Sequence, residues 1–202
     1  MSGVLSGFVG GDEPFDAYDE FVPAHIPEPG PFLEAHDVLA GTPHLAFHRL
    51  SRALFEERTV YDMTFGYNLA RLNLDRRHES AGYRYAEAAD EQAVLRAEFT
   101  PTTEFCPQTH TLTVGSFRAW NGLSDRHEYD IVRVRVAPSH HRSARINTEL
   151  ADLETAYRER GELPDHPATD PAPGSDPPPT RPPSSGADGD AVGDATPPER
   201  PF

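Results

Sequence analysis

The sequence predicts an α+β domain, a small three-stranded sheet covered by helices, with an acidic arm at each end. Within residues 43–161, stretches with helical spacing of apolar residues alternate with stretches in which every second residue is apolar. These stretches follow one another as helix, strand, strand, helix, strand, helix. The net charge of -15 lies almost entirely outside this segment, because residues 46–161 carry 17 acidic residues and 16 arginines.

The first helix is expected over residues 43–57. Thr42-Pro43 is typical of an N-cap followed by proline at the first helical position. Apolar side chains then follow at helical spacing, namely Phe47, Leu50 and Leu54.

Three strands are expected from alternation of apolar and small or polar residues. The first covers residues 64–74, the second residues 93–100 and the third residues 129–136. A polar connection over residues 76–92 separates the first two strands and is too long for a tight hairpin.

Two more helices are expected after the second and third strands. Residues 112–123 keep a helical period up to the stop signal Asn121-Gly122. Ser143 is expected to cap the last helix, which carries an apolar stripe and ends at Gly161.

The two flanking segments are expected to be largely unpacked. Residues 1–42 mix proline and acidic residues with a few aromatics, so they predict a mostly extended arm, part of which packs on the domain. Residues 162–202 hold 12 of the 21 prolines and almost no large apolar residue. Such a segment cannot bury enough surface to offset its ordering entropy, so we expect a disordered acidic tail.

Composition excludes several classes of function. All 18 basic residues are arginine, and the acidic excess argues against a nucleic-acid partner, which requires a clustered basic surface. An acidic surface is also typical of a salt-rich halophilic cytoplasm. There is no apolar run of membrane-spanning length, and one cysteine fits a reducing compartment. We therefore expect a cytoplasmic protein without a membrane partner.

The single cysteine, Cys106, is the first candidate for chemistry. It follows the second expected strand and precedes a helix. Free amides and the macrodipole at a helix N-terminus favour a thiolate, and a thiol with a lowered pKa is a nucleophile or a soft metal ligand. The nearby Glu104 would oppose that shift. The alternative is a buried, inert cysteine, which is common for this residue type.

Several histidines could join Cys106 at one end of the sheet. His110 follows it by four residues, and His140-His141 follows the third strand. This spacing is not that of a recognised zinc site. Cys106, His141 and Asn147 also supply the residue types of a thiol hydrolase, although such a triad is defined by spatial roles.

Cys106 also lies in the first of two segments with a recognisable pattern. The first, residues 99–107, is a strand ending in Thr100-Pro101-Thr102, then a short turn to Cys106-Pro107. The second, residues 136–152, leads from the third strand through Pro138, His141 and Ser143 into a helix with Asn147-Thr148-Glu149-Leu150-Ala151-Asp152. Together these segments resemble the iron-sulfur cluster assembly family that includes SufT-like proteins and the eukaryotic cytosolic targeting subunit. The resemblance covers about residues 94–157; outside it, Thr64-Phe65-Gly66 stands where that family usually has Asp-x-Gly.

The resemblance implies a carrier or adaptor that assembles or delivers iron-sulfur clusters, rather than a turnover enzyme. Cys106 would be the functional thiol and a transient ligand of iron or of a cluster. Its site neighbours would be Thr100, Thr102, Glu104, His110, His141 and Ser143. Since a cluster usually takes four thiolates, one cysteine implies a cluster shared across a homodimer or with a scaffold or apo-client protein.

Two other functions stay open from the residues alone. A thiol enzyme would use Cys106 as nucleophile and His141 as base, which requires the two within hydrogen-bond reach or one water apart. A non-catalytic protein-binding module would instead carry Cys106 as a structural core residue.

Overall fold

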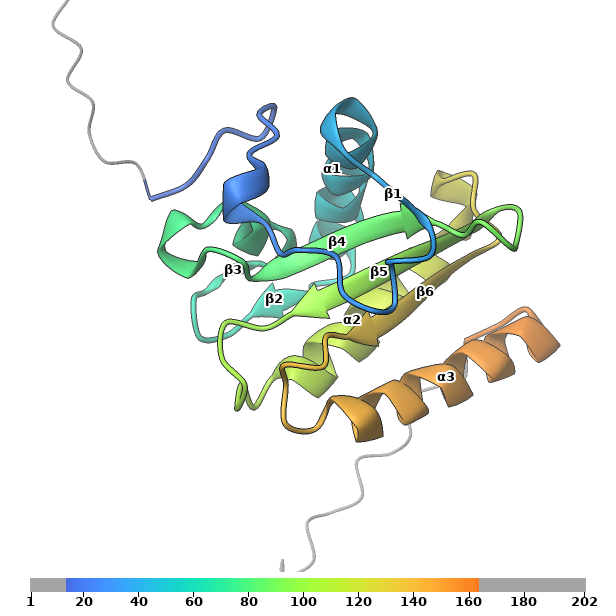
Figure 1. Cartoon of the computed structure of the whole chain (residues 1–202). Coiled ribbons are helices and arrows are strands. Elements are labelled where there is room, and N and C mark those ends of the chain that lie inside the picture. Colours follow the sequence, from blue (N-terminus) through green and yellow to red (C-terminus); the bar gives the residue numbers. More distant parts are fainter. Residues whose placement is uncertain (1–13, 164–202) are drawn as a thin grey trace, which may run out of the picture. The chain divides into compact units, whose positions relative to one another are not determined.

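A four-stranded mixed sheet organises residues 14–163, the part of the chain that the computed structural model describes (Figure 1). Its order is β1-β4-β5-β6, formed by β1 (Asp37–Val38), β4 (Gly82–Glu87), β5 (Val94–Thr100) and β6 (Ile131–Val136). The β1–β4 and β4–β5 pairs are antiparallel, whereas β5 and β6 are parallel. A separate two-stranded ribbon pairs β2 (Tyr61–Asp62) with β3 (Tyr67–Asn68).

The described residues contain the α-helices α1 (Gly41–Glu57), α2 (Thr109–Asn121) and α3 (Ser143–Arg160). Parallel strands need a crossover connection, and α2 supplies it between β5 and β6. Short 3-10 helices occupy connections, namely η1 (Pro23–His25), η2 (Leu69–Leu74), η3 (Arg76–His78) and η4 (Ser124–Arg126). None of the helices between residues 14 and 163 is both long and apolar enough to cross a membrane.

The core lies between the apolar face of the sheet and the helices. Trp120 of α2 is fully buried and packs against Phe47 and Phe55 of α1 and against Tyr83 and Tyr85 of β4. Its indole N–H donates to Ser51 Oγ at 3.1 Å, so its polar atom is satisfied inside the core.

The opposite face of the sheet is polar and is covered by the N-terminal segment. Glu98 of β5, 2% exposed, accepts hydrogen bonds from the backbone N–H groups of Gly30 and Phe32 at 2.7 and 3.3 Å. The Phe32 ring lies over the guanidinium groups of Arg96 and Arg135, at 4.8 and 5.3 Å. Residues 14–40 therefore contribute the edge strand β1 and this cover, in which Leu33 is fully buried.

Most of the expected elements are confirmed. The strands expected over residues 93–100 and 129–136 form β5 and β6, and the three expected helices form α1, α2 and α3. The first helix begins two residues earlier than expected, at Gly41, and Ala40 rather than Thr42 is its N-cap.

Two expectations about strands are wrong, and the sheet has four strands rather than three because β4 and the short β1 join β5 and β6. Residues 64–74 form β3 and then η2, because the Asn68 side chain accepts from the Ala70 N–H and starts a 3-10 helix. Conversely, the supposed connection over residues 76–92 contains β4, a central strand. Residues 1–13, and the expected tail beyond residue 163, lie outside the described residues.

Gly30→Ala is expected to loosen the N-terminal segment from the sheet. A Cβ at position 30 would overlap the Glu98 carboxylate, which would have to give up its bonds to the Gly30 and Phe32 amides. Since hydrogen bonds to charged groups contribute roughly 1.5–3 kcal/mol, the free energy of unfolding in urea titrations should fall by about 2 kcal/mol.

Gly115→Ala is the matched control for this change. Gly115 lies inside α2, and a Cβ at this position would make an ordinary 3.6 Å contact with Val60. Alanine favours a helix over glycine by about 1 kcal/mol. A Gly30→Ala protein as stable as Gly115→Ala would contradict the anchoring role of Glu98.

Candidate functional site

Residues 99–107 and residues 136–152 meet at one end of the sheet. Because β5 and β6 are parallel, with Phe99 in register with Val136, both strands end at the same edge. The cysteine loop, residues 101–108, leaves β5 there, and the histidine loop, residues 137–142, leaves β6. Ala137 N–H donates to the Phe99 carbonyl at 2.8 Å and continues the pairing into the histidine loop.

Both histidines of the histidine loop bind the backbone of the cysteine loop. His140 is 2% exposed, and its Nε2 lies 3.2 Å from the Cys106 carbonyl oxygen. Its Nδ1 accepts from the Arg142 N–H, so Nε2 carries the proton and donates. Burial lowers the pKa of His140, which favours this neutral form. His141 Nδ1 donates to the Glu104 carbonyl at 2.7 Å, and the backbone N–H of His141 donates to the same oxygen.

Asn147 fixes α3 to the end of β6. Its side-chain amide accepts from the Val136 N–H at 2.7 Å and donates to the Val136 carbonyl at 2.9 Å. The amide that could orient a catalytic histidine is therefore bound to strand backbone.

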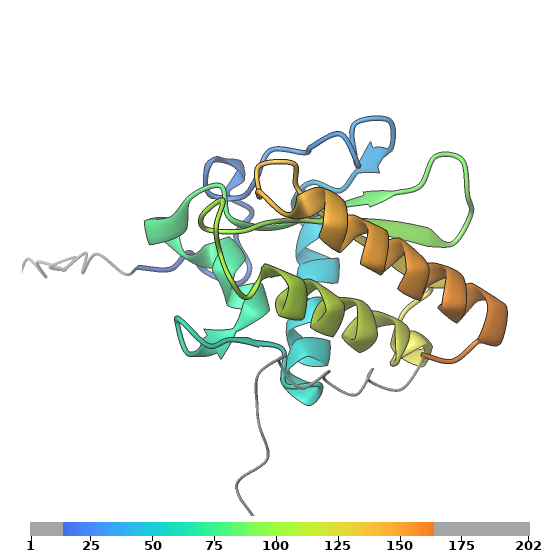
Figure 2. The same cartoon turned by 90° about the horizontal axis from the view of Figure 1, so that it is seen from below.

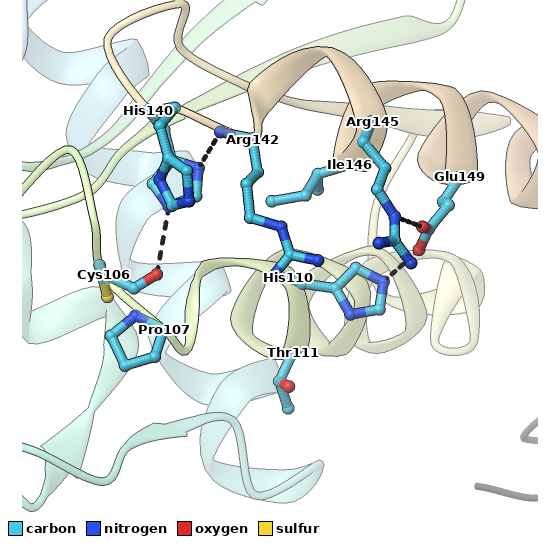
Figure 3. A pocket seen from close by; sticks show the side chains of 10 residues that line it. Cys106, Pro107, His110, Thr111, His140, Arg142, Arg145, Ile146 and Glu149 are labelled. Carbon is cyan, nitrogen blue, oxygen red and sulfur yellow. Dashed lines mark hydrogen bonds and ion pairs between the residues drawn. The ribbon is translucent and has the colours of Figure 1, made fainter. Parts of the chain in front are cut away.

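The thiol of Cys106 is partly exposed. Within residues 14–163 no hydrogen bond reaches its Sγ. Its carbonyl oxygen accepts from the N–H and the hydroxyl of Thr109, at the start of α2, besides His140. Figure 3 shows this oxygen facing His140 while the sulfur points away from His110 and Glu149. The described structure thus holds the backbone of Cys106 and leaves the sulfur available.

A pocket of about 160 Å³ lies beside Cys106, at the point where α2 and α3 begin. Figure 2 shows these two helices side by side, each starting at the same end. The pocket is lined by Cys106, Pro107, His110, Thr111, His140, His141, Arg142, Arg145, Ile146 and Glu149. Its one carboxylate, Glu149, lies 2.6 Å from His110 Nε2 and 3.0 Å from Arg145 Nε. Burial raises the pKa of Glu149, but the Arg145 hydrogen bond and the His110 charge outweigh it and lower the pKa overall.

The residues expected to surround the thiol divide into two groups. His110 and His141 line the pocket with Cys106, and Glu104 contributes its backbone carbonyl to His141. Thr100 and Thr102 stand at the base of the cysteine loop, at and just after the end of β5. Ser143 is the first residue of α3, and the expectation that it caps this helix is wrong, since Arg142 holds the N-cap position without a side-chain cap.

Sequence reasoning missed the contact of His140 with the Cys106 carbonyl and the contacts of Glu149 with His110 and Arg145. The i,i+4 spacing of Arg145 and Glu149 in the last helix is the sequence pattern that predicts their ion pair. Within residues 14–163, no three His, Cys, Asp or Glu side chains are arranged to hold a metal ion.

Two large apolar side chains are exposed among the described residues, and both belong to the surroundings of Cys106. Phe105, the preceding residue, is 63% exposed, and Met63 of the β2–β3 turn is 80% exposed. Gln108 joins that turn to the cysteine loop, because its side chain accepts from the Met63 N–H and donates to the Thr64 hydroxyl.

Comparison with known proteins places the chain in a family whose function is not known. No curated protein matches it. Residues 13–164 match the model of a family described as a domain of unknown function, DUF7998. Because this match spans well over half of the chain, the protein is a member of the DUF7998 family.

Proposed function

We propose that this protein assembles or delivers iron-sulfur clusters as a carrier or adaptor, and that Cys106 is the thiol that contacts the cargo. One observation carries the proposal. The two segments that resemble the iron-sulfur assembly family are separated by a helix and a strand, yet they meet around one partly exposed thiol.

The way the cysteine loop is held supports this role. The Cys106 backbone is fixed from two sides, by His140 and by Thr109, so little conformational freedom remains to be lost when the sulfur binds a ligand. The sulfur itself forms no hydrogen bond within residues 14–163 that a ligand would have to break. A fixed backbone with a free thiol suits reversible binding of iron or a cluster.

The scarcity of other ligands supports a carrier rather than a resident cluster. The chain has one cysteine, whereas clusters usually take four thiolates. The remaining ligands would come from a scaffold or apo-client protein, and the exposed Phe105 and Met63 beside the thiol would be covered when it docks. A second copy of this chain would add one thiol only.

Cys106→Ser is expected to abolish the binding of iron and sulfide during anaerobic reconstitution of the full chain. A serine hydroxyl is a poor ligand for iron in a cluster, while the substitution leaves the backbone contacts of the loop in place. The measurements are the charge-transfer absorbance of the reconstituted protein, its iron content, and transfer to an apo-client. Arg160→Ala, which keeps the thiol and alters an exposed side chain at the far end of α3, is the control and should still load.

Equal loading and equal client maturation by the wild type and by Cys106→Ser would overturn the proposal. The alkylation rate of the native thiol tests the alternative of a binding module. Rapid alkylation is expected here, whereas the slow rate of a buried thiol would favour a binding module with a structural cysteine.

A further inference from the structure

The pocket beside Cys106 has more arginine than carboxylate side chains, in a segment, residues 46–161, whose 17 acidic residues and 16 arginines nearly balance. Its charged and titratable residues, besides Cys106, are Arg142, Arg145, His110, His140, His141 and Glu149. This local excess of positive charge is not a property of the segment as a whole. The pocket therefore calls for an explanation of its own.

Arg142 supplies the unused donors of the pocket. Its backbone N–H donates to His140, but its guanidinium makes no hydrogen bond or ion pair within residues 14–163. Figure 3 shows this side chain reaching between His140 and His110. A guanidinium is a planar fork of five N–H donors that matches oxyanions bidentately.

Glu149 shows that the pocket already binds one anionic group. His110 and Arg145 both contact this carboxylate, at 2.6 and 3.0 Å. The Arg145 guanidinium and the His110 ring are thus directed at an anion from the protein itself, while the Arg142 guanidinium is not engaged within residues 14–163.

Two helix ends add to the positive potential of the pocket. Neither α2 nor α3 has a side-chain cap or an acidic residue in its first turn. The first N–H group of each helix, that of Thr109 and that of Ser143, donates to the Cys106 and the His140 carbonyl. The dipoles and the next N–H groups of both helices have no acidic side chain or side-chain cap beside them where the helices begin.

We propose that this anion pocket, the ten-residue pocket beside Cys106, binds a small multivalent anion, with Arg142 as its main contact. Its volume of about 160 Å³ is ample for a tetrahedral ion, since a single water needs only about 10–15 Å³ on such a measure. Two sources share this chemistry, namely a free oxyanion such as phosphate and the anionic iron-sulfur cargo. The second source rests on the proposed function; the first is independent of it.

The first arm of the test uses inorganic phosphate and the full chain without iron. Backbone amide resonances of Ala144 and Arg145 should shift saturably in two-dimensional NMR spectra at constant ionic strength. Arg142→Ala should weaken the phosphate affinity about tenfold, which corresponds to one charged hydrogen bond. Glu149→Gln should strengthen it, because the competing internal anion is removed. Arg160→Ala, an exposed arginine at the far end of α3, should leave it unchanged.

The second arm uses ferrous iron and sulfide. Arg142→Ala should load less cargo than the wild type although it keeps Cys106, whereas Cys106→Ser should lose the cargo and still bind phosphate.

The two arms separate failure of the pocket from failure of the proposed function. Absence of saturable phosphate shifts in the wild type, or equal affinity in the wild type and Arg142→Ala, overturns the anion pocket. Phosphate binding as expected, together with full cargo loading by Cys106→Ser, supports the anion pocket and removes the proposed function.

Discussion

Lowering the pH from about 7 to about 4 is expected to remove several kcal/mol from the free energy of unfolding, because two histidines of α1 are buried in the neutral form. His44 and His48 are 3% and 1% exposed, and their rings are stacked with centroids 6.0 Å apart. Nδ1 of His44 and both ring nitrogens of His48 have no hydrogen-bond partner in the part of the chain that the structure describes. A proton added to either ring would therefore place an unpaired charge in the core.

The sign follows from the pKa values of the two states. Burial, followed by the charges of neighbouring groups, lowers the pKa of His44 from 6.5 to about 3 and that of His48 from 6.5 to about 4. Those neighbours include Arg84 beside His44 and Arg52 beside His48. Below pH 6.5 the unfolded chain binds protons that the folded chain does not bind. Each histidine therefore lowers the free energy of unfolding by about 1.4 kcal/mol for every pH unit below 6.5. Its contribution to this free energy is complete above pH 6.5 and is lost as the pH falls towards its pKa in the folded state.

Urea titrations at a series of pH values check this expectation. The double variant His44→Phe/His48→Leu removes both groups and should show a much flatter decline in the free energy of unfolding between about pH 6.5 and 4. His141→Gln alters an exposed histidine and should keep the wild-type slope. Parallel curves for the wild type and the double variant would show that acid acts through other groups.

Local sequence patterns predicted those helices and strands whose buried face can be read from the spacing of their own apolar residues. In β5 the inward residues alternate with Arg96 and Glu98, and in β6 they alternate with two arginines. In α3 the apolar residues recur at helical spacing. β4 was missed because residues 76–92 are polar overall and its Arg84 is buried, 8% exposed, as part of the arm-covered face. The cover that buries it comes from residues far away in the chain, which no local pattern reports.

The candidate site was predictable only in part, for the same reason. The position of Cys106 between a strand and a helix can be read from the chain. The contact of His140 with its carbonyl depends on the parallel register of β5 and β6, which sets the two loops side by side. The anion pocket depends further on α2 and α3 starting at the same end of the sheet, a long-range arrangement.

Side-chain amides bind the backbone of the sheet at positions where no neighbouring strand is present. Local sequence patterns do not predict these contacts either. β6 is an edge strand, and Asn121 and Asn147 each bind both backbone groups of one of its residues, Val132 and Val136. Arg135 donates to the Val134 carbonyl between them. The free edge of β6 is thereby occupied by side chains of the same chain, which protects it from pairing with another molecule.

Asn73 does the same for β4. The short strand β1 reaches only Ala86 and Glu87, so the other end of β4 has no strand on that side. Asn73, 2% exposed, accepts from the Tyr83 N–H at 2.8 Å and donates to its carbonyl at 2.7 Å. The neighbouring Gly82 has φ of +115°, a conformation that side chains disfavour, and thereby lets Asn73 approach.

Gly82→Ala is therefore expected to lower the free energy of unfolding by about 3–5 kcal/mol. A Cβ there would overlap the Asn73 side chain and lie 3.2 Å from the Asn73 backbone nitrogen. Strain at the positive φ costs roughly 1–3 kcal/mol, and the two displaced buried hydrogen bonds add about 1 kcal/mol each. Urea titration gives the loss, and faster hydrogen exchange at the Tyr83 amide locates it.

A double-mutant cycle with Asn73→Ala tests whether the overlap is the cause. Asn73→Ala alone leaves the Tyr83 N–H and carbonyl unpaired, but it also removes the side chain that a Cβ at position 82 would meet. The double variant should thus be more stable than the sum of the two single losses predicts, by about 1–2 kcal/mol. Strictly additive losses would assign the effect of Gly82→Ala to backbone strain alone and remove Asn73 from the explanation.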